Sequence, residues 1–121
     1  MVKNAVFLCV LAISAPVNAG ERLAMRVTPN VAFEPALLTI RTIIEADPDN
    51  RRLEIVAQSA DFYRSSWVQL DGASAPRLNV FEFKNLPTGV YEVTSVLVGS
   101  AGRRAIVSRG FRVASAAGSP R

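Results

Sequence analysis

The feature that most restricts the fold of this 121-residue chain is an alternation of apolar and polar side chains in short runs. In the first clear run, Leu23, Met25 and Val27 alternate with charged or small residues. A β-strand places successive side chains on opposite faces, so a two-residue period is typical of a strand with one buried face. No segment shows a helical 3.6-residue period as clearly. The sequence therefore predicts an all-β domain.

Turn-forming residues divide the alternating pattern into seven predicted strands. The strongest turn signal is Asp47-Pro48-Asp49-Asn50, because proline is favoured at the second position of a turn and aspartate at the first. The predicted strands occupy residues 22–27, 38–45, 52–58, 63–70, 80–84, 91–98 and 103–113. Seven short strands spaced about 8–12 residues apart indicate an antiparallel two-sheet sandwich. A small β-barrel is the alternative architecture.

Residues 1–19 have the pattern of a cleaved secretory signal peptide. Lys3 supplies a positive charge, an apolar run follows at 5–13, and Val17 and Ala19 are the small residues expected before a cleavage site. The run is shorter than the roughly 20 residues that span a bilayer, so no membrane span is expected after cleavage. A buried N-terminal helix or membrane anchor is the alternative. We expect a folded domain at 20–114, a flexible tail at 115–121, and a bacterial periplasmic or secreted location.

The absence of certain residue types excludes several chemistries. The chain has no histidine, and its single cysteine, Cys9, lies in the predicted leader. The usual neutral-pH acid/base and the commonest metal ligand are therefore missing, and a disulfide cannot stabilise the mature domain. We expect no catalytic residue, no metal site and no cofactor. Asp47 and Asp49 offer oxygen ligands for calcium, but the glycine and glutamate of a calcium loop are missing, and a turn accounts for both residues.

Residues 86–93, Leu-Pro-Thr-Gly-Val-Tyr-Glu-Val, resemble the corner before the sixth strand of immunoglobulin-like and fibronectin type III-like domains. Transthyretin-like modules of secreted bacterial proteins carry a similar stretch. The resemblance implies a bacterial secreted β-sandwich in which Tyr91 hydrogen-bonds to nearby backbone and Gly89 forms the close turn. The cysteine pair of antibody-type domains is missing, and Trp67 falls in the fourth predicted strand rather than the second or third. The resemblance therefore concerns architecture rather than function.

A cluster of arginines is the first candidate binding site. Strand reversal sends the loops at 47–52, 71–76 and 99–104 to one end of the sandwich, which brings Arg51 and Arg52 close to Arg103 and Arg104. Arginine favours paired hydrogen bonds to carboxylate or phosphate. We expect this end to bind an anionic group, with a solvated rim balanced by nearby aspartates as the alternative.

An aromatic pair is the second candidate. The alternation in strand 63–70 places Tyr63 and Trp67 on the outer face of a predicted edge strand. Exposed aromatic side chains on an edge strand form a contact surface for protein or sugar. The alternative is that a bulge turns Trp67 inward or a loop covers it.

Together these features predict an exported, non-enzymatic binding or accessory module whose partner is an envelope or secreted protein. An unpaired edge strand also permits a partner to add a strand. A domain that binds carbohydrate or another envelope polymer is the alternative function, and a purely structural subunit is a third. Nucleic acid is excluded as a partner by the export pattern, the low net charge of +4 and the scarcity of aromatic residues.

Overall fold

The computed structural model describes residues 22–115, so the predicted leader at 1–19 and residues 116–121 of the predicted tail lie outside the described residues. The strands are β1 (Leu23–Thr28), β2 (Val31–Phe33), β3 (Ala36–Ile44), β4 (Arg52–Gln58), β5 (Tyr63–Gln69), β6 (Leu78–Leu86), β7 (Gly89–Gly99) and β8 (Gly102–Ala114), with one short 3-10 turn, η2 (Gly72–Ser74). Within 22–115 no helix has the length and apolar character needed to cross a membrane.

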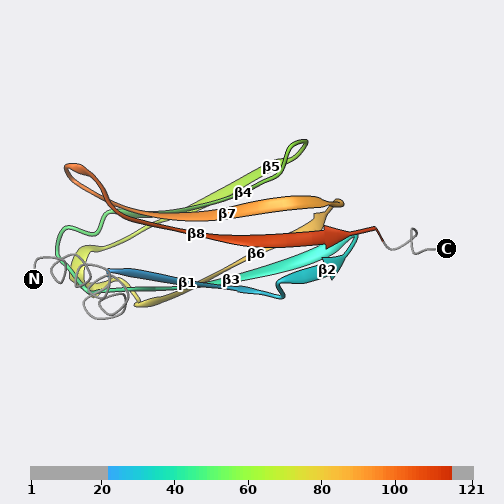
Figure 1. Cartoon of the computed structure of the whole chain (residues 1–121). Helices are drawn as coiled ribbons and strands as arrows, with labels where there is room; N and C mark the ends of the chain where they lie inside the picture. Colours follow the sequence, from blue (N-terminus) through green and yellow to red (C-terminus); the bar gives the residue numbers. More distant parts are fainter. Residues whose placement is uncertain (1–21, 116–121) are drawn as a thin grey trace, which may run out of the picture.

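The strands form two facing sheets, so the prediction of an all-β sandwich is confirmed (Figure 1). One sheet has the order β1-β3-β6, and the other, which is strongly curled, has the order β2-β8-β7-β4-β5. The predicted number of seven strands is wrong, because β2 is an additional strand. β2 also pairs parallel to β8, whereas every other pairing is antiparallel. Three residues are too few to show an alternating pattern, which is why the sequence does not reveal β2.

The core lies between the sheets and consists of the side chains that the alternation turns inward. Leu38 and Ile40 of β3 and Leu53 and Ile55 of β4 belong to this core, and all four are fully buried. Burial of each large aliphatic side chain contributes about 1.5–3 kcal/mol to folding. Residues 22–115 contain no cysteine, so apolar burial and the backbone ladders hold the sheets together without a cross-link.

Tyr91 occupies the corner position that the resemblance implies. Its buried ring packs edge-on against Phe62 and at a tilt against Phe111, with ring centroids 6.1 and 5.8 Å away. The phenol Oη donates a hydrogen bond of 2.7 Å to the carbonyl oxygen of Pro87. Burial raises the pKa of the Tyr91 phenol above its ordinary value of 10.0. At Gly89 a Cβ atom would lie 3.3 Å from the Ser59 side chain, so the absence of one lets the two segments approach closely.

We predict that Tyr91→Phe lowers the free energy of unfolding by about 0.5–1.5 kcal/mol, because it removes one hydrogen bond and leaves the ring packing intact. Urea denaturation followed by circular dichroism measures the change. Tyr63→Phe is the matched control, since the side chain of Tyr63 is exposed and the variant should unfold as the wild type does. Equal stability of Tyr91→Phe and wild type would show that the corner bond contributes nothing.

Candidate binding surface

The three loops named in the sequence analysis do meet at one end of the sandwich. The backbone N–H of Gly72 donates to the carbonyl oxygen of Asn50 at 3.1 Å, which joins the β5–β6 loop to the β3–β4 loop. The N–H and hydroxyl of Ser100 donate to Asp49 Oδ1 at 3.1 and 2.7 Å, which joins the β7–β8 hairpin to the same loop. Asn50 is fully buried, and its Nδ2 donates to the Glu45 carbonyl oxygen at 2.9 Å. We call this end the arginine pole.

Arg104 points into the arginine pole rather than toward a partner. In the β7–β8 ladder Leu97 pairs with Ala105 and Val98 with Arg103, so Arg104 is the extra residue of a β-bulge. Its guanidinium lies 3.1 Å from an Asp47 carboxylate oxygen and 3.7 Å from an Asp49 oxygen. The Arg104 side chain is only 13% exposed. Because of the bulge, the Arg104 side chain points inward and connects the β7–β8 hairpin to the β3–β4 loop through its ion pairs. We call this set of ion pairs the brace.

The other three predicted arginines of the arginine pole have different surroundings. Arg51 donates to the Pro48 carbonyl oxygen at 2.9 Å and lies 3.9 Å from Asp49. Arg52 pairs with Glu54 on the same strand at 2.7 Å. Arg103 is exposed, and none of the ion pairs found within 22–115 includes it. The four arginines are thus neighbours, but they do not converge on one anion site.

The carboxylates of Asp47 and Asp49 are engaged within the arginine pole. The carboxylates of Asp47 and Asp49 both face the Arg104 guanidinium, and Asp47 Oδ1 also accepts the Asp49 N–H at 2.8 Å. No cluster of three or more metal-binding side chains occurs in the part of the chain that the structure describes. Both aspartates thus have partners in the turn and in the ion pairs with Arg104.

Trp67 lies on the outer face of β5 with 61% of its surface exposed, so the predicted outward orientation is correct. The Arg52 guanidinium carbon lies 5.6 Å from the centroid of the Trp67 ring, within the range of a cation–π contact. Glu54, the partner of Arg52, sits directly opposite Trp67 in the β4–β5 ladder. The structure thus joins one arginine of the first candidate site to the tryptophan of the second.

Strand register extends this surface across the five-stranded sheet. The row containing Trp67 and Glu54 continues to Val96 on β7 and Ile106 on β8. The adjoining row runs from Arg52 through Val98 to Arg103. We call the outer face formed by these residues the Trp67 surface: Arg52, Glu54, Trp67, Val96, Val98, Arg103 and Ile106. An open groove of about 400 Å³ runs between Trp67 and the arginine pole, lined by Arg51, Arg52, Trp67, Gln69, Leu70, Val98 and Gly99.

Tyr63 lies at the far end of β5, with 63% of its surface exposed. A second hollow of about 230 Å³ separates Tyr63 from Trp67, with Ser65 between them on the same strand. β5 is the last strand of its sheet, as the sequence predicts for the aromatic pair. At its inner side Arg64 donates to the Lys84 carbonyl oxygen of β6 at 3.0 Å. The backbone edge of β5 thus lies beside both exposed aromatic rings.

No protein-family model and no curated protein matches the sequence. Solved structures do match the fold. The superoxide reductase (neelaredoxin) from Ignicoccus hospitalis matches with a TM-score of 0.58 at 14% identity, over 82% of this chain and 86% of that chain. The sulfur carrier protein SoxY from Chlorobium limicola f thiosulfatophilum matches with a TM-score of 0.55 at 12% identity, over 85% and 94%. At these identities the matches show a shared all-β, two-sheet sandwich fold and nothing further.

We predict that Gly99→Ala lowers the free energy of unfolding by about 1–3 kcal/mol, the usual cost of overpacking. A Cβ atom at Gly99 would lie 2.7 Å from Arg104 Cδ and 2.9 Å from the Asp49 carbonyl oxygen, so the brace would have to shift. Gly110→Ala is the matched control on β8, because a Cβ there meets no atom within 4 Å. Thermal and urea unfolding compare the two variants; equal stability would contradict a tightly packed arginine pole.

We also predict that Asp49 contributes to acid sensitivity. Hydrogen bonds from the Ser100 hydroxyl and then the Ser100 N–H lower the pKa of Asp49 below 3.8, and Arg51 and Arg104 lower it further. A depressed pKa stabilises the fold above pH 3.8, and this stability is lost as the pH falls through the folded-state pKa. Asp49→Asn should therefore lose less stability than the wild type between about pH 5 and pH 2. Urea midpoints across this range measure the difference, and identical pH profiles of Asp49→Asn and the wild type would contradict the prediction.

Proposed function

We propose that this protein is an exported, non-enzymatic binding module of the bacterial envelope or secreted space, and that it binds a partner protein through the Trp67 surface. The observation that carries the proposal is the exposed Trp67 ring with the Arg52 guanidinium 5.6 Å from its centroid. Export rests on the signal-peptide pattern of residues 1–19.

The Trp67 surface has the composition of an interface centre. Tryptophan and arginine are enriched among the residues that contribute most to protein–protein binding. The Arg52–Glu54 bond of 2.7 Å fixes the guanidinium beside the ring before any partner arrives, so less side-chain entropy is lost on binding. Ile106, exposed in the same row as Trp67, adds apolar area beyond the ring. A preorganised aromatic and aliphatic patch with a charged rim favours protein as the ligand.

The position of β5 adds a second source of affinity. β5 is a seven-residue edge strand, and it contains no proline, which is one of the devices that protect edges from pairing. An extended segment of the partner would bond to the free backbone groups of β5 and place alternate side chains beside Tyr63 and Trp67. Recognition would then combine backbone hydrogen bonds with contacts to the Trp67 surface.

The absence of catalytic activity in this proposal rests on side-chain chemistry. The sequence has no histidine, and residues 22–115 have no cysteine. The structural neighbour from Ignicoccus hospitalis is a superoxide reductase, but at 14% identity the likeness extends to the fold alone. The titratable groups of the arginine pole, Asp47, Asp49 and Arg104, are engaged with one another. They serve the fold rather than a substrate.

One observation favours carbohydrate as the alternative ligand. Tyr63 and Trp67 flank a hollow of about 230 Å³ on one face of β5, and both rings are exposed. Aromatic rings with polar neighbours suit the apolar faces and hydroxyls of a sugar chain. Ser65 is the polar residue between the two rings. This arrangement would position a polymer along the edge strand rather than across the sheet.

We predict that Trp67→Ala reduces capture of the partner protein at least tenfold, because it removes the centre of the surface and the support for Arg52. The tagged protein is crosslinked in its native envelope, and the captured proteins are quantified. Phe33→Ala is the matched control, since Phe33 is a comparably exposed aromatic residue, at 65%, on the opposite edge strand β2. Capture should be unchanged in Phe33→Ala.

The same variants separate the two ligands. Retention on isolated envelope polysaccharide is measured in parallel for the wild type, Trp67→Ala and Phe33→Ala. Loss of polysaccharide retention in Trp67→Ala, with protein capture unchanged, would replace the protein partner by a carbohydrate. Equal protein capture by all three proteins, without any change in polysaccharide retention, would overturn the assignment of function to the Trp67 surface.

A further inference from the structure

The outer face of the three-stranded sheet carries a pair of arginines that faces away from the Trp67 surface. Arg26 on β1 and Arg41 on β3 are direct partners in the antiparallel ladder, so their side chains leave the same face side by side. Both residues are exposed. None of the ion pairs found within residues 22–115 includes either guanidinium. Like charges directly opposite each other destabilise a sheet, so the repulsion between Arg26 and Arg41 lowers the stability of the fold.

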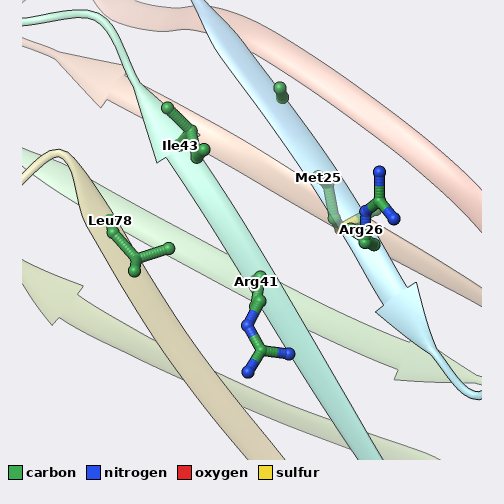
Figure 2. A pocket seen from close by; sticks show the side chains of 6 residues that line it. Met25, Arg26, Arg41, Ile43 and Leu78 are labelled. Atoms are coloured by element: carbon green, nitrogen blue, oxygen red, sulfur yellow. The ribbon is translucent and has the colours of Figure 1, made fainter.

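The next row of the sheet beside the arginines is apolar. Ala24, Ile43 and Leu78 are partners across β1, β3 and β6, and Ile43 and Leu78 are about half exposed. Figure 2 shows Ile43, Leu78 and the two arginines on this part of the sheet, and together with Ala24 and Met25 they line one open hollow. Its volume is about 240 Å³, which is below the roughly 300–1,000 Å³ of pockets for drug-sized ligands. The hollow therefore suits a small group with one anionic end and one apolar end.

We propose that this hollow binds a free aliphatic carboxylate. The carboxylate would accept hydrogen bonds from the guanidiniums of Arg26 and Arg41, which present the planar donor geometry that carboxylates prefer. A negative charge between the two arginines also removes their mutual repulsion, so binding reduces the cost to folding of placing like charges opposite each other. The alkyl chain lies over Ile43 and Leu78 and removes their exposed apolar surface from water.

Charge and composition argue against two other occupants. A second copy docked by two-fold symmetry would present the same arginine pair to this one, and the like charges would repel. A membrane surface is usually contacted through tryptophan and tyrosine, whereas the apolar residues around this hollow include no aromatic side chain. Glu82, exposed opposite Thr39 in the row beyond Arg41, further reduces attraction to an extended anionic surface. A single free carboxylate brings no second arginine pair, needs no aromatic side chains and does not extend as far as Glu82.

The test uses NMR titration of the ¹⁵N-labelled protein with decanoate, decanol and acetate, each below its aggregation threshold. We expect saturable shifts of the Arg26, Arg41 and Leu78 amides with decanoate, and at least tenfold weaker binding of decanol, which lacks the charge, and of acetate, which lacks the chain. Arg41→Gln and Arg26→Gln should each lower the affinity for decanoate at least tenfold. Their melting temperatures should equal or exceed that of the wild type, because each variant removes a repulsion.

Arg112→Gln, at an exposed arginine on β8, is the control and should bind decanoate as the wild type does. Equal binding of decanol and decanoate, or full binding by both Arg41→Gln and Arg26→Gln, would overturn the proposal. Two further outcomes would also overturn it. Co-sedimentation with phosphatidylglycerol vesicles without decanoate binding would assign the face to a membrane. Self-association that Arg41→Gln abolishes would assign it to a second copy.

Discussion

Burial of one face of each sheet is the interaction on which the rest of this structure depends, because residues 22–115 have no cysteine to cross-link them. Leu38 and Ile40 on one sheet and Leu53 and Leu97 on the other are inaccessible to solvent. The strand period commits every second side chain to this core and leaves the others outside it. Outer positions such as Trp67 can therefore carry exposed functional side chains without weakening the core. The two surfaces proposed for binding accordingly lie on the outer faces of the sheets.

A single extra residue decides how the arginine pole is used. Regular alternation back from Ala105 would turn Arg104 outward and Arg103 inward. The bulge reverses the two, so that Arg103 shares the outer row with Val98 and Arg104 reaches Asp47 and Asp49. Gly99 allows this arrangement, since any side chain there would collide with Arg104 and Asp49. Arg104 thereby pairs with Asp47 and Asp49 of the β3–β4 turn. The positive charge of Arg103 lies on the outer face of the sheet.

The sequence predicts those features that depend on local periodicity or local turn chemistry. The inward residues of the strands and the outward orientation of Trp67 follow from residues close together in the chain, and the hydrogen bond of Tyr91 agrees with what the resemblance of residues 86–93 implies. The parallel strand β2 is too short to leave a periodic signal. Gly110, a residue type that often marks a bulge, pairs regularly with Glu92, while the bulge lies at Arg104. One-residue shifts of this kind depend on packing against distant loops.

Besides the position of the bulge, the sequence does not reveal the register in which neighbouring strands pair. The contact of Arg52 with Trp67 and the pairing of Arg26 with Arg41 each require two strands to be aligned to the residue. These alignments separate two chemistries onto opposite sides of one core. An aromatic and guanidinium surface suited to protein lies on one sheet, and a guanidinium and aliphatic hollow suited to a carboxylate lies on the other. Since neither surface uses a residue of the other, the two proposed ligands would not compete for the same side chains.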